Sequence, residues 1–245
     1  MPYQTLLYSV KEHIAGITLN RPKAGNAVNL AMAQELQEIC QEINHDNAVY
    51  AVTLTGAGDA FCLGGDTEEG LCHPADAVAA IDRPVIAAVN GDALGEGLEI
   101  ALAADIRIAS AKARFGLPRL AKGRLPSDGG TQRLPRIIGR GKALELLMTA
   151  EAINAGEALE IGLVSYVVPP EVLAEELQKL AETIAAKGPI ALRYLKEAIN
   201  KGMDLTLEQG LRLEADLYFL LHTTADRTEG VKSYLEKRKP DYKGK

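Results

Sequence analysis

The amino-acid sequence predicts an α/β fold in which ββα units form a core and helices alone form the C-terminal region. Three observations support this prediction. Residues 3–8 and 13–19 alternate between apolar and polar side chains, as the two strands of a hairpin do. Between residues 30 and 170, runs with helical spacing alternate with short β-rich runs that end in Gly or Pro. After Glu171 every apolar run has helical spacing.

The individual elements follow from the same spacing. The hairpin is expected to turn near Lys11 and Glu12. Further strands are expected at residues 48–55, 84–89, 106–109 and 163–168. Helices are expected at residues 30–43, 98–104, 131–138, 142–148, 173–187, 190–201, 207–221 and 226–237. Thr206 and Gln209 have the spacing of a capping box, which marks the start of the helix at 207–221.

Composition excludes several classes of function for this chain of 245 residues. Its net charge of −6 argues against nucleic acid as a partner, because phosphate backbones select basic surfaces. The longest apolar runs are too short to span a bilayer, and the opening residues lack the features of a secretory signal. The three cysteines form no regular framework, which is typical of reduced thiols in the cytoplasm. We therefore expect a cytoplasmic protein without membrane segments.

Two glycine clusters stand out once common motifs are excluded. The sequence has no P-loop, no Gly-x-Ser-x-Gly elbow and no metal-binding His-Glu-x-x-His or Cys-x-x-Cys motif, so no metal site is expected. The clusters read FCLGGD at 61–66 and NGDALGEGLE at 90–99. Glycines let the backbone approach a ligand, and backbone N–H groups from two loops can stabilise an enolate oxygen. Alternatively, each cluster is a turn between a strand and a helix.

Taken together and in this order, the clusters resemble those of the crotonase (enoyl-CoA hydratase/isomerase) superfamily. Further runs along nearly the whole chain carry the same resemblance: LNRPKAGNA at 19–27, PVIAAVNG at 84–91, FGLP at 115–118, GGTQRL at 129–134, GLV at 162–164, EG at 229–230 and EKR at 236–238. The resemblance implies a crotonase (ClpP-like) fold of repeated ββα units. It divides the chain into a core at residues 1–187 and a helical trimerisation region at 188–245.

The resemblance also implies a chemistry and an assembly. The substrate would be an acyl-CoA thioester, with coenzyme A as part of the substrate and no separate metal or redox cofactor. The assembly would be a homotrimer or a dimer of trimers. The segment between the first glycine cluster and the next strand is shorter than the family pattern, which suggests an acyl pocket that is open or completed by a neighbour.

Five residues are the candidates for catalysis. By resemblance, the backbone N–H groups of Gly65 and Glu96 form the oxyanion hole, and Glu99 is the carboxylate that activates water. Arg119 occupies the position of the family's second glutamate, and an arginine does not act as a general acid at neutral pH. Either Glu96 or Asp128 could replace that acid, while Arg119 could pair with a carboxylate of the protein or of the substrate. Asp128 could instead cap the helix that follows it.

The resemblance assigns a second group of residues to coenzyme A. Lys23, Ala24 and Asn26 would follow the pantetheine and ribose, and Tyr218 and Lys237 match positions that contact the adenine, often across a subunit boundary. Gly64 and Asp66 flank the first oxyanion donor and belong to the same binding surface.

Three readings of the activity remain open from the sequence. The first is an enoyl-CoA hydratase, a lyase that adds water across the 2,3 double bond. The second is another enolate reaction that uses one carboxylate: double-bond isomerisation, decarboxylation or C–C hydrolysis. The third is a non-catalytic CoA-binding protein, which the retained Glu99 argues against.

Overall fold

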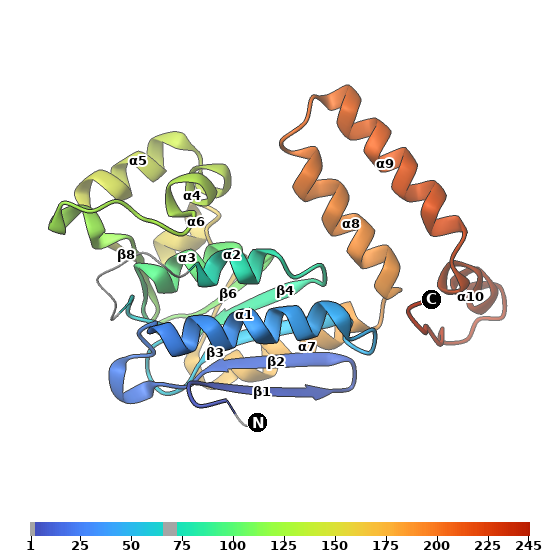
Figure 1. Cartoon of the computed structure of the whole chain (residues 1–245), viewed down its shortest axis with the longest axis horizontal. Helices are drawn as coiled ribbons and strands as arrows, with labels where there is room; N and C mark the ends of the chain where they lie inside the picture. The colour runs from blue at the N-terminus through green and yellow to red at the C-terminus, as the bar shows by residue number, and fades with distance from the viewer. Residues whose placement is uncertain (1–2, 66–72) are drawn as a thin grey trace.

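A six-stranded sheet forms the centre of the computed structural model, which describes residues 3–65 and 73–245 (Figure 1). Its strands are β1 (Leu6–Lys11), β2 (Ile14–Leu19), β3 (Ala51–Gly56), β4 (Val85–Val89), β6 (Ile106–Ser110) and β9 (Tyr166–Val168), in the order β1-β2-β3-β4-β6-β9. Only the β1–β2 pair is antiparallel. Glu12 and His13 form the predicted hairpin turn with φ of 49° and 67°, the left-handed pair that a two-residue hairpin loop requires.

Both faces of this sheet are covered, which explains the continuous apolar run of β4. Every residue of β4 is buried. Successive side chains of a strand point to opposite faces. Val85, Ala87 and Val89 accordingly join the main core with α1 (Leu30–His45), whereas Ile86 and Ala88 pack toward α7 (Leu173–Ala185).

A small second sheet holds the segments that carry the glycine clusters. It consists of β5 (Ala93–Leu94), β7 (Arg114–Gly116) and β8 (Ala152–Asn154). An isolated parallel β-bridge between Ala93 and Cys62 extends this sheet, and a second one pairs Val28 with Gly65. The sequence did not predict these strands, because two or three residues are too few to show an alternating pattern.

Short helices form connections between strands, some within one sheet and some between the two sheets. They are α2 (Pro74–Ala79), α3 (Glu96–Ala103), α4 (Gly130–Ile138), α5 (Arg140–Thr149) and α6 (Ala155–Glu160), with 3-10 turns η1 (Pro22–Ala24), η2 (Pro118–Lys122) and η3 (Pro170–Val172). The helix expected at 98–104 is buried as predicted but begins at Glu96, because Gly95 with φ of 53° turns the chain into it. Neither α2 nor α6 was predicted, although Asn154 and Glu157 form a capping box that signals α6.

The C-terminal helices extend away from the core (Figure 1). They are α8 (Pro189–Gly202), α9 (Leu207–His222) and α10 (Ala225–Leu235), and the predicted capping box of Thr206 and Gln209 begins α9. The chain end returns to the core, where the Tyr50 hydroxyl donates to the Tyr242 carbonyl at 3.2 Å. Among the described residues, no helix has the length and apolar character needed to cross a bilayer.

Candidate active site

The second sheet brings the two glycine clusters side by side. The Cys62 N–H donates to the Asp92 carbonyl at 3.0 Å, and the Leu94 N–H donates to the Cys62 carbonyl at 2.9 Å. Only glycine fits at position 97, because a Cβ there would lie 2.1 Å from the Cys62 carbonyl oxygen. The clusters, separated by about thirty residues in sequence, therefore form one surface.

The two expected oxyanion donors lie together on that surface. A Cβ on Gly65 would lie 2.5 Å from Oε1 of Glu96, so the two residues are in direct contact. Glu96 is the first residue of α3, where helix geometry leaves the N–H without an intrahelical acceptor. Neither the Gly65 nor the Glu96 N–H donates a hydrogen bond within the described part of the chain. Gly64, with φ of 119°, adopts a conformation that favours glycine.

Arg119 forms an ion pair with Glu96, which is one of the alternatives left by the sequence. Its guanidinium contacts Oε1 of Glu96 and also donates to the Ser127 hydroxyl at 3.0 Å. The two ionic side chains are 21% and 14% exposed, so the pair is shielded from most of the solvent. Burial lowers the pKa of Arg119, but a guanidinium remains charged at neutral pH.

Glu99 is fully buried, and its two carboxylate oxygens have different surroundings. Oε1 accepts hydrogen bonds from the N–H groups of Asp128 at 2.7 Å and Gly130 at 2.9 Å. Oε2 has no hydrogen-bond partner among the described residues. Burial raises the pKa of Glu99, the two backbone hydrogen bonds oppose that shift, and the nearby Asp128 carboxylate adds to it. The sequence offered Glu96 as a replacement acid, but Glu96 pairs with Arg119.

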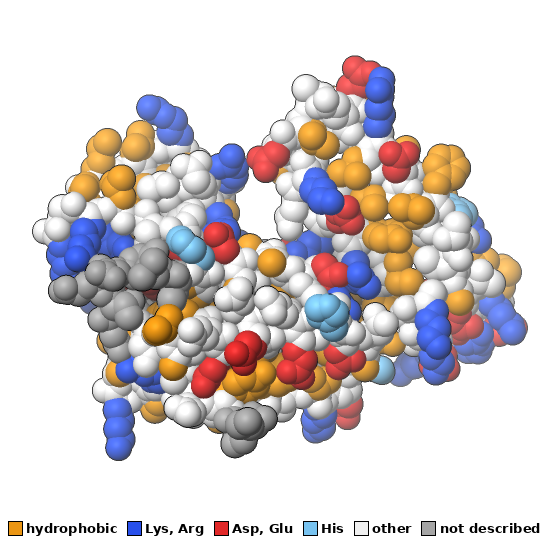
Figure 2. Space-filling model, viewed as in Figure 1, with side chains coloured by type: hydrophobic (Ala, Val, Ile, Leu, Met, Phe, Trp, Pro, Cys, Tyr) orange, Lys and Arg blue, Asp and Glu red, His pale blue; other side chains and the backbone are white. Residues whose placement is uncertain are grey.

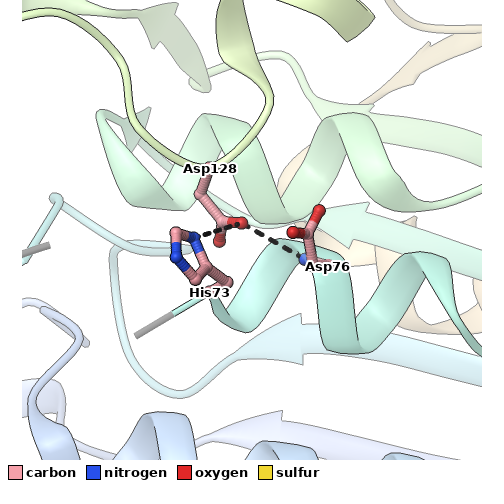
Figure 3. A group of neighbouring side chains, drawn as sticks. All are labelled: His73, Asp76 and Asp128. Atoms are coloured by element: carbon pink, nitrogen blue, oxygen red, sulfur yellow. Dashed lines mark hydrogen bonds and ion pairs between the residues drawn. The ribbon is translucent and has the colours of Figure 1, made fainter. Parts of the chain in front are cut away.

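The prediction that Asp128 caps the helix after it is wrong. Gly129 occupies the N-cap position of α4 with φ of 92° and makes no side-chain cap. The Asp128 carboxylate instead accepts from the N–H groups of Ala75 at 2.6 Å and Asp76 at 3.3 Å, at the start of α2 (Figure 3). Burial raises the pKa of Asp128, and the hydrogen bond from Ala75 opposes that shift. It caps a helix some fifty residues away because the fold brings that helix end to its loop.

His73, Asp76 and Asp128 form a small cluster whose nitrogen and oxygen atoms lie within 4.8 Å of one another (Figure 3). Nδ1 of His73 lies 3.6 Å from Asp128, and Asp76 forms an ion pair with Arg133 at 2.6 Å. Each carboxylate thus already has donors within the protein. The arrangement is that of a polar junction between α2 and the loop before α4.

The segment expected to bind pantetheine lies beside the first glycine cluster. The Leu63 N–H donates to the Gly25 carbonyl at 3.0 Å, so residues 23–26 run along that loop. Lys23 and Ala24 are exposed there. Asn26 is fully buried, and its side chain accepts from Arg21 N–H and donates to the carbonyls of residues 57 and 60. Asn26 therefore shapes the loop through its side chain.

The structure does not bring the expected adenine contacts to the glycine clusters of the same chain. Tyr218 lies on α9 and is 59% exposed, and Lys237 follows α10 and is exposed as well. In Figure 1 these helices lie at the opposite end of the molecule from β8 and the start of α3. The remaining candidate, Asp66, lies outside the described residues.

Sequence reasoning missed two residues of the site, Ser127 and Arg133. Ser127 holds Arg119, and Arg133 donates to the Asp128 carbonyl at 2.7 Å. Arg133 belongs to the GGTQRL run that contributed to the family resemblance, so the signal was present without an assigned role.

Comparisons with known proteins agree along nearly the whole chain. A family model described as enoyl-CoA hydratase/isomerase matches residues 9–245. The crotonyl-CoA hydratase of Syntrophomonas wolfei is 41% identical over 257 residues, which cover 99% of each chain. The (E)-benzylidenesuccinyl-CoA hydratase of Thauera aromatica is 40% identical over an alignment of 250 residues, which covers 96% of this chain and 97% of that protein.

A solved structure gives the same result for the fold. The crystal structure of an enoyl-CoA hydratase from Bacillus anthracis superposes with a TM-score of 0.94 at 42% identity, covering 99% of this chain and all of that one. The mixed α/β fold with a helical C-terminal region, expected from the sequence, is thereby confirmed.

Proposed function

The chain belongs to the enoyl-CoA hydratase/isomerase family, and from this premise we propose that it adds water across the C2–C3 double bond of an enoyl-CoA thioester. One observation supports the proposal above all others. Glu99 is a buried carboxylate with one oxygen fixed by two N–H groups and the other without a partner among the described residues. That arrangement suits a group that must exchange a proton with a substrate or water.

The first part of the proposed mechanism concerns the thioester carbonyl. Its oxygen would accept hydrogen bonds from the N–H groups of Gly65 and Glu96. These donors are fixed by the backbone, so they would stabilise the negative charge of the enolate without reorganising. The Arg119 guanidinium would keep the neighbouring Glu96 carboxylate from opposing that charge.

The second part concerns the proton. Oε2 of Glu99 would take a proton from water as the water oxygen bonds to C3 and the C2–C3 π electrons move into the enolate. Glu99 would then return this proton to C2 as the carbonyl re-forms, so that one water molecule is added and the enzyme is regenerated. A raised pKa of Glu99 supports this double role, because burial favours the protonated form of the carboxyl from which the proton is returned. Arg119 is excluded as the acid.

The test is hydration of crotonyl-CoA, followed as the loss of enoyl absorbance, with Glu99→Gln. This variant keeps the size of the side chain and removes proton transfer, so kcat should fall roughly 10²- to 10⁴-fold. The exposed Glu175→Gln is the matched control and should leave the rate unchanged. The ionised Glu99 carboxylate is the base, so kcat/KM of the wild type should fall when acid protonates it. Because burial raises the pKa of Glu99 above its ordinary value of 4.5, this fall should occur at a higher pH than for an ordinary glutamate. A wild-type rate for Glu99→Gln would refute the assignment.

Arg119 favours a second candidate substrate class within the same reaction. The Thauera aromatica relative is named for a succinyl thioester, whose acyl group carries a second, free carboxylate. A guanidinium can hold such a carboxylate with two parallel hydrogen bonds. Arg119 is 21% exposed and lies on the oxyanion surface, which supports this candidate. Faster turnover of a dicarboxylic enoyl-CoA than of crotonyl-CoA would favour it.

The proposal extends to binding and assembly. Coenzyme A would enter as part of the substrate, without a separate cofactor, along Lys23, Ala24 and Asn26 and the first glycine cluster, Gly64 and Asp66 included. Residues 188–245 would form a trimerisation region, giving a homotrimer or a dimer of trimers in the cytoplasm, with Tyr218 and Lys237 reaching a neighbour's adenine. The apolar side chains exposed on α9 and α10 support this assembly (Figure 2).

A further inference from the structure

Asp128 makes contacts in two directions from a single residue. Its backbone N–H donates to Oε1 of Glu99 at 2.7 Å. Its side chain points the other way, toward the start of α2, and accepts from Ala75 at 2.6 Å and Asp76 at 3.3 Å (Figure 3). One residue therefore connects the carboxylate on α3 with a helix that begins more than twenty residues earlier in the chain.

Arg133 makes a second connection between the same parts. One guanidinium nitrogen donates to the Asp128 carbonyl at 2.7 Å, and another contacts the Asp76 carboxylate at 2.6 Å. The guanidinium lies directly on Gly129, where a Cβ would be 2.1 Å from it. A Cβ on Gly130 would lie 3.0 Å from Oε1 of Glu99. The loop thus fits closely between Arg133 on one side and Glu99 on the other.

We propose that Asp128, supported by Arg133, is a positioning residue that anchors its loop to α2 and thereby fixes the carboxylate of Glu99. The inference rests on the role proposed above for Glu99. It assigns Asp128 no proton transfer, because its carboxylate is directed at the N–H groups of α2 and the His73 ring rather than at a substrate. The sequence had offered Asp128 as a replacement acid, and the geometry points to anchoring instead.

The physical basis is the cost of leaving buried donors without partners. Asp128 is 2% exposed, and its removal would leave the Ala75 N–H buried without an acceptor. The loop would relax, and the two N–H groups on Oε1 of Glu99 would move with it. Displacing a reacting group by about 1 Å can lower a rate by about 10²-fold.

Asparagine separates anchoring from acid catalysis at this position. It is isosteric with aspartate and caps a helix N-terminus about equally well, so it retains the 2.6 Å bond from Ala75. It has no ionisable proton. Asp128→Asn should therefore keep kcat for crotonyl-CoA within about threefold of the wild type, whereas Asp128→Ala should lower kcat by about 10- to 100-fold. KM should change little in both, because within residues 3–65 and 73–245 the contacts of Asp128 are with Glu99, Arg133, His73 and the start of α2 rather than with the proposed CoA surface.

A second pair of variants tests the support from Arg133. Arg133→Gln removes both guanidinium contacts with the junction and should lower kcat in the same direction as Asp128→Ala. Arg136→Gln is the matched control on the same helix, because Arg136 is 56% exposed and contacts Gln132 and Asp204 rather than the junction. Equal effects of the two arginine variants would contradict a specific anchor.

Amide hydrogen exchange gives a readout that does not depend on turnover. Asp128→Ala should speed exchange at residues 75–80 and at Gly130, whose N–H is held by Glu99, and Asp128→Asn should not. A loss of kcat in Asp128→Asn as large as in Asp128→Ala would overturn the inference and make Asp128 an acid. Unchanged kcat and exchange in Asp128→Ala would overturn it as well. If the wild type hydrated no enoyl-CoA, the proposed function would fail, while the exchange comparison would still decide the anchor.

Discussion

Replacing Arg119 with glutamine should slow turnover because it leaves the Glu96 carboxylate unpaired beside the oxyanion hole. The carboxylate is in contact with the Gly65 backbone, as the 2.5 Å approach of a hypothetical Cβ indicates. A unit charge about 6 Å from the enolate oxygen, at an effective dielectric constant of about 20, opposes the enolate by about 3 kcal/mol. That free energy corresponds to a rate about 10²-fold lower.

The double variant Glu96→Gln with Arg119→Gln separates this electrostatic effect from simple loss of a side chain. It removes both charges, so it should recover most of the activity that Arg119→Gln loses. The single variants should also be less stable. A pair that is 14% and 21% exposed lies between surface and buried pairs, and we expect about 1–3 kcal/mol for losing one partner.

The assay is a double-mutant cycle measured on kcat for crotonyl-CoA and on thermal unfolding. Protein concentration is held constant, since Tm depends on it if the chain assembles. The reasoning predicts a non-additive cycle, with the double variant faster than Arg119→Gln alone. Additive losses in kcat, or a wild-type rate for Arg119→Gln, would show that the charge of Glu96 does not reach the reacting oxygen.

Two further predictions concern packing and assembly. Gly97→Ala should destabilise the fold and abolish hydration, because the new Cβ would lie 2.1 Å from the Cys62 carbonyl oxygen. In the control Gly141→Ala the new Cβ has no atom within 4 Å, so the free energy of unfolding should stay the same or rise by up to ~1 kcal/mol. A stable, active Gly97→Ala would contradict the close approach of the loops. Phe219→Asp should dissociate the assembly in sedimentation experiments, since the Phe219 side chain is 70% exposed in the single chain. The control Leu125→Asp should not dissociate it, because Leu125 is 69% exposed but lies outside residues 188–245. An unchanged mass for both variants would place the interface elsewhere.

Local patterns in the sequence determined most of the regular elements. The hairpin, the buried β4 and the capping box at Thr206 could be predicted because each depends on spacing within a few residues. The strands β5, β7 and β8 could not, since two or three residues carry no period and pair only when the rest of the fold places them together. The glycine clusters could be recognised because each lies in one contiguous run, and the family resemblance then gave Glu99 its expected role.

What the sequence by itself determined, therefore, is which residue types are available and which short segments become helix or strand. The tertiary structure alone decided how the ionic groups pair. Arg119 forms an ion pair with Glu96, which lies 23 positions earlier in the chain. Asp128 accepts a hydrogen bond from the start of α2, about fifty positions earlier, rather than capping the helix that follows it. The physical reason is that a hydrogen bond or ion pair depends on distance in space, and no local pattern records which distant donors folding brings within 3 Å of a carboxylate.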